Sequence, residues 1–425
     1  MSYLCRMIDH IHVPSEIGAL QKVIVHRPDP GIARISPRQA GELLFDDIVH
    51  LPKMQEEHDI FTNVLSQFIG RENVLEVKDL IFQGLKADPK AREHFMGYIA
   101  NFEELPAQYV KELNAMDDDL LSQVLITGQD PNTNYIYFDP IPNLIFTRDI
   151  AVVVNDHIVI TKAAKEARFR ENLLSRFIFW YHPSFQHLKE QKRLINMNDV
   201  DLFPASRMGE WISIEGGDMM MINENYLLIG CSERTTPHAF HSLKKVLFER
   251  DVIEHVAMVV IPNERSYMHI DTIFTHIDTN YMVAFKPIVV EGLSSYVEVH
   301  DRDGSEREYP SISEFIKKEV NENMEFILSG QGISPYQERE QWTDGCNLIA
   351  IRPGVALTYD RNPYTEMAFK SAGFNVIRAE DFLRDAKSDP TYAATMQKTI
   401  ITIPSNELSR ARGGSHCMTC PILRS

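Results

Sequence analysis

Residues 410–421 read Arg-Ala-Arg-Gly-Gly-Ser-His-Cys-Met-Thr-Cys-Pro. The two adjacent glycines permit backbone angles that other residues resist, so the chain can turn tightly just before Cys417. Arg412 and His416 bring positive charge close to the Cys417 thiol, which favours the nucleophilic thiolate. The stretch therefore predicts a reactive cysteine, although taken alone it also fits a flexible basic tail with incidental thiols.

The spacing of Cys417 and Cys420 also leaves a redox pair or half of a zinc site open. No second CxxC follows and no helical HxxxH lies nearby, so we expect no metal. The five cysteines of the chain are scattered and odd in number. The first residues show no secretory signal pattern, and no apolar run approaches the length of a bilayer span. Together these features predict free thiols in a reducing cytoplasm.

Size and charge narrow the class of protein further. A chain of 425 residues can form two or more domains, or one large fold with an insertion. The formal net charge of −17 argues against binding to nucleic acid and to an anionic membrane surface. A small cationic substrate would instead be attracted.

The first third of the chain combines strands with a helical stretch. Leu20–Pro28 is typical of a buried strand closed by a proline turn, and Lys53–Phe68 has the spacing of an amphipathic helix. A short strand follows at Val74–Val77. Residues 80–129 then lose the β-branched alternation and take on helical periodicity, which predicts an inserted helical subdomain.

Strands return from Pro140 and alternate with helices. We expect strands at Phe177–Trp180 and Ile288–Val290, among others, and a helix over 165–175. Short ββαβ units recur, each with a polar motif near a strand end. This pattern favours a single cyclic assembly with a central site over a Rossmann sheet, because no GxGxxG follows a strand and no Walker A sequence is present.

Three polar motifs suit a planar cation. Phe146 and Asp149 could cover the face of such a cation and accept its N–H groups. In Glu215-Gly-Gly-Asp the glycines let the backbone approach a ligand beside two carboxylates. His269 and Asp271 would share one face of a strand, as an acid/base and a binding carboxylate. Each motif alone also fits a turn with solvated acids.

The conjunction of these groups is more informative than any single motif. A cysteine, a histidine and several carboxylates on loops or strand ends form a nucleophile with an acid/base and an anionic pocket. An anionic pocket would destabilise an acyl-transfer intermediate, because the charge that develops there is negative. It would stabilise a guanidinium, which is positively charged.

The sequence resembles the arginine deiminase family within the guanidine-modifying, amidinotransferase-like superfamily. The resemblance spans nearly the whole chain and rests on these motifs: Leu20–Pro28, Leu43-Leu-Phe-Asp-Asp47, Phe146-Thr-Arg-Asp149, Glu215-Gly-Gly-Asp218, Glu233-Arg-Thr-Thr236, Met268-His-Ile-Asp-Thr272, Tyr359-Asp-Arg-Asn362 and Arg412–Pro421.

The resemblance implies an α/β fold, a five-bladed α/β propeller of pseudo-fivefold ββαβ modules. Residues 1–79 would form the first module, 80–135 an inserted helical subdomain, and 136–425 the remaining modules. The exposed faces of such a propeller would suit a homo-oligomer.

The implied reaction is hydrolysis of L-arginine to L-citrulline and ammonia through a covalent amidino-cysteine, with no metal or organic cofactor. Cys417 would be the nucleophile and His269 the general acid/base. Asp149 and Asp271 would hold the guanidinium, with Glu215 assisting. Several further residues would bind the rest of the substrate: Arg168 and Arg234 at its α-carboxylate, Arg412 as a gate or contact, and Asn143, Phe146, Leu44 and Asn347 along the pocket.

One stretch, 150–164, departs from the family pattern. It reads Asn155-Asp156-His157 and later Thr161-Lys-Ala-Ala164, close to the expected substrate. A modified arginine, another guanidino or ureido compound, or transfer of the amidino group to an amine therefore stays open as the activity. A catalytically silent binding propeller and a CxxC zinc protein are the alternatives from other classes.

Overall fold

The computed structural model describes residues 8, 10–39, 41–45 and 47–425. Within these ranges the chain has a mixed α/β fold, and none of its helices is both long and apolar enough to cross a membrane. Cys5 lies outside the described residues. The other four cysteines are buried and unpaired.

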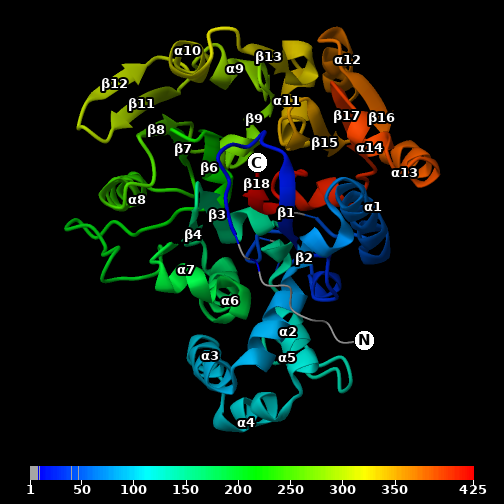
Figure 1. The fold of residues 1–425 in the computed structure, drawn as a ribbon. Coiled ribbons are helices and arrows are strands. Elements are labelled where there is room, and N and C mark those ends of the chain that lie inside the picture. The colour runs from blue at the N-terminus through cyan, green and yellow to red at the C-terminus, as the bar shows by residue number, and fades with distance from the viewer. Residues whose placement is uncertain (1–7, 9, 40, 46) are drawn as a thin grey trace.

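Five sheets form the framework (Figure 1). Their strands, in sheet order, are β18 (Cys420–Arg424), β1 (Leu20–Val25) and β2 (Val74–Glu76); β3 (Ala151–Val154), β4 (His157–Ile160) and β5 (Leu194–Asn196); β12 (Glu306–Tyr309), β11 (Tyr296–Asp301), β8 (His255–Val260), β7 (Tyr226–Cys231) and β6 (Met219–Asn223); β13 (Glu325–Leu328), β10 (Tyr281–Ala284) and β9 (Phe274–Asp278); β14 (Ile349–Arg352), β15 (Val355–Tyr359), β17 (Thr399–Ile403) and β16 (Asn375–Arg378).

The same pairing recurs in every sheet. Two strands pair antiparallel, and a third is added parallel to the second, as in β3, β4 and β5. The sheets that begin with β6, β9, β14 and β18 repeat this order. A strand that pairs parallel to its neighbour requires a crossover connection, so each unit contains a longer connecting segment before its third strand.

The two ends of the chain meet in one sheet. β18 pairs antiparallel with β1, with Leu20 opposite Arg424 and Ile24 opposite Cys420. In Figure 1 these strands lie side by side near the centre of the molecule. Cys420 and Ile422 are almost fully buried, so residues 410–425 are not a flexible tail. The nucleophile candidate is thereby fixed at the middle of the fold.

Fourteen α-helices in the described chain connect and cover the sheets. They are α1 (Leu51–Ile69), α2 (Val77–Ala87), α3 (Pro89–Phe102), α4 (Ala107–Ala115), α5 (Asp118–Thr127), α6 (Phe169–Tyr181), α7 (Gln186–Glu190), α8 (Pro237–Glu249), α9 (Lys286–Val289), α10 (Ile312–Phe315), α11 (Tyr336–Trp342), α12 (Pro363–Ser371), α13 (Ala379–Ser388) and α14 (Tyr392–Thr395).

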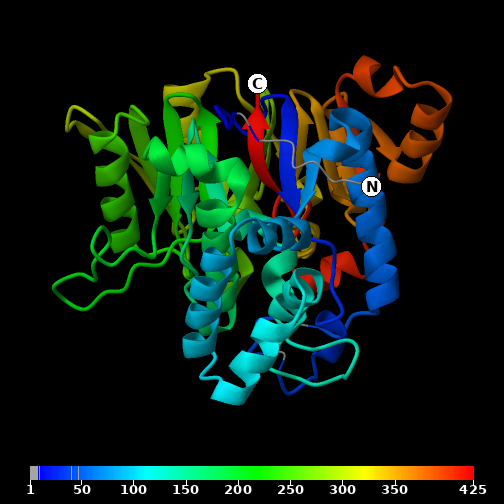
Figure 2. The same cartoon turned by 60° about the horizontal axis from the view of Figure 1, so that its bottom comes forward.

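Helices α2 to α5 follow one another without an intervening strand and project from one end of the molecule (Figures 1 and 2). Two of them begin at an aspartate that accepts backbone N–H bonds: Asp88 caps α3 and Asp117 caps α5. Their apolar faces share one core with α6, where the Phe95 and Phe177 rings stack 4.4 Å apart. This core joins the helices to the sheet of β3.

Two expected strands are helices instead. Phe177–Trp180 completes α6, which buries Phe177 and Phe179 and continues the helix that begins at Phe169. Ile288–Val290 overlaps α9, whose first turn holds Pro287, a residue suited to a helix start. In both cases a short apolar run does not distinguish a buried strand from a buried helix.

Candidate active site

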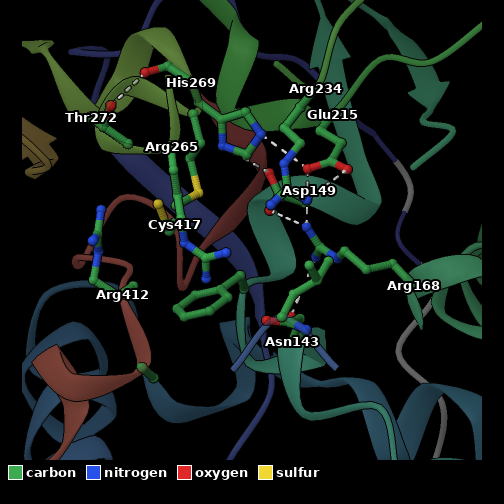
Figure 3. A pocket seen from close by; sticks show the side chains of 14 residues that line it. Asn143, Asp149, Arg168, Glu215, Arg234, Arg265, His269, Thr272, Arg412 and Cys417 are labelled. Carbon is green, nitrogen blue, oxygen red and sulfur yellow. Dashed lines mark hydrogen bonds and ion pairs between the residues drawn. The ribbon is translucent and has the colours of Figure 1, made fainter. Parts of the chain in front are cut away.

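Five turns carry the site residues, and each turn comes shortly before the first strand of one sheet. The turns place Asp149 before β3, Glu215 before β6, His269 and Asp271 before β9, Asn347 before β14, and Cys417 before β18. Figure 3 shows Asp149, Glu215, His269 and Cys417 gathered at one pocket. Because the sheets repeat one pairing order, equivalent points of five remote segments meet. The structure thus brings together the residues that the sequence analysis grouped.

Glycines allow the turns to pack this closely. A Cβ atom on Gly217 would lie 2.4 Å from Nδ1 of His269, and one on Gly414 would lie 2.6 Å from Oδ1 of Asn347. None of Gly217, Gly413 and Gly414 has a positive φ. The left-handed residue of the C-terminal stretch is Arg412, with φ of 63°. The two glycines before Cys417 therefore serve close packing, not the tight turn that we expected of them.

The turns enclose a small cavity of about 30 Å³. Its lining consists of Leu44, Asn143, Phe146, Asp149, Arg168, Glu215, Arg234, Arg265, Met268, His269, Thr272, Ala411, Arg412 and Cys417. This volume suits one or two water molecules. Asp271 and Asn347 are absent from the lining and lie behind the cysteine.

Asn347 holds Cys417 from behind. Its side-chain oxygen accepts the backbone N–H groups of His416 and Cys417, each at 3.1 Å. Its amide nitrogen donates to the Cys417 Sγ at 3.2 Å and to the Asp271 carbonyl at 3.0 Å. Asn347 therefore fixes the position of the sulfur and offers it a donor, where we had expected a lining residue.

In this state Cys417 is a neutral thiol. Burial, followed by the negative charges of Asp271 and Asp149, raises the pKa of Cys417 well above its ordinary value. The Cys417 Sγ donates to Oδ2 of Asp271 at 3.4 Å. The expectation that Arg412 and His416 stabilise a thiolate is wrong here, because the Arg412 guanidinium lies over the Trp342 ring, 3.3 Å from its centroid, and His416 faces carboxylates.

A buried chain of polar groups supports Asp271. His416 places Nδ1 2.9 Å from Oδ2 of Asp271 and Nε2 3.2 Å from Oε2 of Glu16. Glu16 in turn forms a bidentate ion pair with Arg148, at 3.2 and 3.1 Å. The other Asp271 oxygen, Oδ1, is buried and accepts no hydrogen bond within the described chain. Asp271 thus presents an unfilled acceptor beside the nucleophile.

His269 is charged at neutral pH. Burial lowers its pKa, but the Asp149 charge and the hydrogen bond to Glu215 outweigh burial and raise the pKa to about 10. Nε2 lies 3.0 Å from Oε2 of Glu215, and Nδ1 lies 4.0 Å from Oδ1 of Asp149. An imidazolium at this point can act as a general acid.

A guanidinium from the chain itself already neutralises the two carboxylates. Arg168 Nη1 lies 2.6 Å from Oδ2 of Asp149 and 3.3 Å from Oε2 of Glu215. Burial raises the pKa of the Glu215 carboxyl, but Arg168 and the hydrogen bond from His269 lower it below the ordinary value overall. Asp149 also accepts the Gly217 N–H at 3.0 Å. Both acids face a cation.

This arrangement differs from the expected role of Arg168. Its Nε and Nη2 contact Oε2 of Glu171 at 2.9 and 2.8 Å, and Nη2 donates to the Asn143 carbonyl at 3.4 Å. The Arg168 side chain is buried and faces carboxylates of the chain. Binding of a substrate carboxylate by Arg168 stays a prediction, and in this state its guanidinium lies in the anionic part of the site.

The remaining expected binding residues line the cavity at its edges. Arg234 Nη1 lies 3.8 Å from Oε1 of Glu215. Asn143 donates to the Leu43 carbonyl at 2.7 Å, next to Leu44, and the Phe146 ring packs closely against Gly413. In Figure 3 the Arg234 and Arg412 side chains lie on different sides of His269 and Cys417.

Sequence reasoning missed several residues around the site. Met268 lines the cavity and stands first in the His269 motif, where it was given no role, and Arg265 lies three residues before it, so extending the motif backwards would have found Arg265. Glu171 lies three residues after Arg168 and could have been recognised as its helical partner. Glu16 carried no local signal, because its role depends on His416, 400 positions away.

The stretch 150–164, which departs from the family's sequence pattern, also reaches the site. The Ala164 N–H donates to Oε1 of Glu215 at 3.1 Å, and the Ala163 N–H donates to Oδ1 of Asn172 at 2.9 Å. These are backbone contacts, which a change of side chain leaves in place. The altered residues thus hold the Glu215 carboxylate through the main chain.

One oxygen of Asp149, one of Glu215 and one ring nitrogen of His269 lie within 4.8 Å of one another, close enough to ligate a metal ion. The Arg168 contacts show that a guanidinium also fits these carboxylates. A planar cation can use both acids at once through separate N–H groups. The geometry is therefore that of a cation site in which a guanidinium already lies.

The chain is similar to known proteins along nearly its whole length. The family model described as arginine deiminase matches residues 41–424. An arginine deiminase from Pediococcus pentosaceus is 31% identical over 457 residues, covering 98% of this chain and 99% of the relative. A structure of DDAH from Pseudomonas aeruginosa with citrulline shares 12% identity and a TM-score of 0.48, covering 96% of this chain and 100% of that one. From the extent of the first two matches, this chain belongs to the arginine deiminase family.

Proposed function

We propose that the protein hydrolyses L-arginine to L-citrulline and ammonia through a covalent intermediate on Cys417. One observation carries the proposal. The sulfur of Cys417 and the imidazolium of His269 share a buried cavity with two carboxylates that already hold a guanidinium. Membership of the arginine deiminase family supports the same activity.

Substrate binding uses the acceptors of the site. The guanidinium of arginine lies against Asp149 and Glu215, and one of its N–H groups reaches the unfilled Oδ1 of Asp271. Satisfying a buried orphan acceptor recovers about 1–3 kcal/mol. The positive charge then lies beside the Cys417 sulfur, which opposes the effect of the acids and favours the thiolate.

The first half of the reaction forms the intermediate. The Cys417 thiol loses its proton through its hydrogen bond to Asp271, and the sulfur attacks the guanidinium carbon. His269 donates its proton to one terminal nitrogen, which leaves as ammonia. The carbon remains bonded to the sulfur, to the alkyl nitrogen and to the second terminal nitrogen, and Asn347 donates to the sulfur throughout.

The second half releases the product. His269, now neutral, takes a proton from a water that attacks the same carbon. The carbon–sulfur bond then breaks, the proton of the new hydroxyl passes to solvent as the citrulline carbonyl forms, Asp271 returns its proton to the sulfur, and citrulline departs. Glu215, 3.0 Å from the imidazole, stabilises the histidine whenever it is charged. Cys417, Asp271 and His269 thus return to their starting states, and the proton released to solvent balances the positive charge lost from arginine.

Arginine supplied as the only substrate tests this activity. The proposal expects citrulline and ammonia in equal amounts, and their loss in Cys417→Ala. Turnover that requires an added amine would indicate amidino transfer instead, and turnover only of methylated or acylated arginines would indicate a modified substrate. Turnover by Cys417→Ala would refute the nucleophile.

We also propose that the framework is a five-bladed α/β propeller, with residues 80–135 as a helical subdomain inserted after the first module, 1–79, and with 136–425 forming the other modules. The support is the recurrence of one pairing order in five sheets. The closing pair β1 and β18 would then join the two ends of the ring.

Free thiols support a reducing compartment, and we propose the cytoplasm. The four described cysteines are unpaired. A homo-oligomer stays a prediction, which light scattering of the purified protein can test.

A further inference from the structure

We propose that in the free enzyme Arg168 occupies the subsite of the substrate guanidinium, and that substrate binds by exchanging one guanidinium for another. The inference rests on the proposed function. It follows from the position of Arg168 Nη1, 2.6 Å from Asp149 and 3.3 Å from Glu215, on the same two carboxylates that the substrate needs.

Both guanidinium groups cannot be present together. With Arg168 in place the cavity measures about 30 Å³, which leaves room for water and not for the end of an arginine side chain. The Asp149 and Glu215 side chains line this cavity and are otherwise buried, so a ligand reaches the carboxylates only through it. Arg168 must therefore move before Asp149 and Glu215 can bind a ligand.

Glu171 determines which part of Arg168 moves. Its Oε2 contacts Nε and Nη2 of Arg168, at 2.9 and 2.8 Å, while Nη1 alone reaches the site acids. A rotation about this edge withdraws Nη1 without breaking the pair with Glu171. Glu171 is thus a positioning residue for the exchange, acting through Arg168.

The exchange selects a class of substrate. Once displaced, Arg168 has lost two ion-pair partners in a buried site, which is costly unless another anion replaces them. A guanidine that carries a carboxylate supplies that anion, so the number of ion pairs is preserved. A guanidine with an uncharged tail displaces Arg168 but offers it no anion, so the two ion pairs of Arg168 are lost without replacement. The site therefore favours guanidino acids over simple alkylguanidines.

Calorimetric titration in the Cys417→Ala background separates this idea from a simple carboxylate clamp. The ligands are L-arginine and n-butylguanidine, which lacks the carboxylate. Adding Arg168→Ala removes the internal competitor, so butylguanidine should bind more tightly, on the order of tenfold or more, given about 1.5–3 kcal/mol for a hydrogen bond to a charged group. Arg168→Lys keeps a cation in place and should keep butylguanidine weak.

Arg176→Ala is the matched control, because Arg176 lies in α6, the helix that begins just after Arg168, outside the cavity lining, with its guanidinium 6.0 Å from the centre of the Tyr98 ring. It should leave both affinities unchanged. Unchanged or weaker butylguanidine binding in folded Arg168→Ala would overturn the proposal. Citrulline formation by the wild type is measured separately, so failure of the exchange and failure of the deiminase activity are distinguishable.

If Arg168→Ala does not fold, a structure of Cys417→Ala with bound L-arginine decides the question. The proposal expects the ligand guanidinium on Asp149 and Glu215, with Arg168 Nη1 moved away from both. A ligand bound while Nη1 still contacts Asp149 would refute it.

Discussion

Replacing Asn347 by aspartate removes one donor from the nucleophile and keeps the shape of the turn. The wild-type amide nitrogen donates to the Cys417 Sγ at 3.2 Å, while the oxygen accepts the N–H groups of His416 and Cys417. Aspartate retains the acceptor for both N–H groups. It puts an anionic oxygen next to the sulfur instead of a donor.

The magnitude follows from these contacts. A hydrogen bond to a charged group contributes about 1.5–3 kcal/mol, so losing the donor to the thiolate should reduce kcat/KM by roughly 10- to 150-fold. The new negative charge adds to that loss, because it raises the pKa of a thiol that Asp271 and Asp149 already hold high. We expect a reduction of about a hundredfold or more.

Citrulline formation from L-arginine, measured across pH, is the assay. For Asn347→Asp we expect a fall in kcat/KM, a lower melting temperature because the Asp271 carbonyl loses its donor and a carboxylate is buried, and a remaining rate that rises with pH because the thiolate has become scarcer. Asn347→Ala is the contrasting variant. It leaves the His416 and Cys417 N–H groups without the side-chain acceptor, so it should lose stability as well as activity.

The result that would refute this reasoning is specific. If Asn347→Asp keeps wild-type kcat/KM, the amide does not stabilise the sulfur during the reaction. If Asn347→Ala keeps the wild-type melting temperature, the acceptor role toward the two N–H groups is wrong.

Three further predictions rest on the packing at Gly217 and on the raised pKa values of His26 and Cys417. Gly217→Ala would put a Cβ 2.4 Å from His269 Nδ1, so the ring must shift and kcat should fall by about a hundredfold; Gly97→Ala, where nothing lies within 4 Å, is the control, and an unaffected Gly217→Ala enzyme would contradict the packing argument. Burial lowers the pKa of His26, but Glu76 and Asp29 raise it to about 10, above the ordinary value of 6.5. The stability that His26 contributes is therefore complete below about pH 6.5 and is lost as the pH rises to 10. Over this range the unfolding free energy should decline by up to about 1.4 kcal/mol per pH unit, and the decline should be smaller in His26→Asn. A parallel decline in both proteins would exclude His26 as the source. Because the pKa of Cys417 is raised, its alkylation by iodoacetamide in the free enzyme should still accelerate above pH 9, whereas a rate that levels off near pH 7 would mean a thiolate at rest.

The sequence predicted which side chains meet in the site better than it predicted their protonation states. Cys417, His269, Asp149 and Glu215 do meet in one cavity, because each lies at the start of a sheet and that position is readable as a polar motif beside an apolar run. The charge on Cys417 was not readable. It depends on burial and on Asp271, and both arise only when the turns come together.

Other misses share the same cause. Phe177–Trp180 was expected as a strand because a short apolar run fits either element, and only packing of α6 against α3 settles the matter. The contacts of Arg168 with Asp149 and Glu215 were also unreadable, because folding brings them together from remote segments, while its binding of a substrate carboxylate stays a prediction. Glu16 has no motif at all, and tertiary contact alone gives it a role.

Rapid acid quenching of the enzyme during turnover of L-arginine, followed by mass spectrometry of residues 413–424, tests the covalent mechanism most directly. The account predicts a peptide carrying the mass of arginine less ammonia, attached at Cys417 and absent from Cys417→Ala. A peptide carrying only an amidino group would show that the alkyl amine leaves first, as in amidino transfer. Full turnover with no adduct at any quench time, or an adduct on another residue, would contradict the central claim.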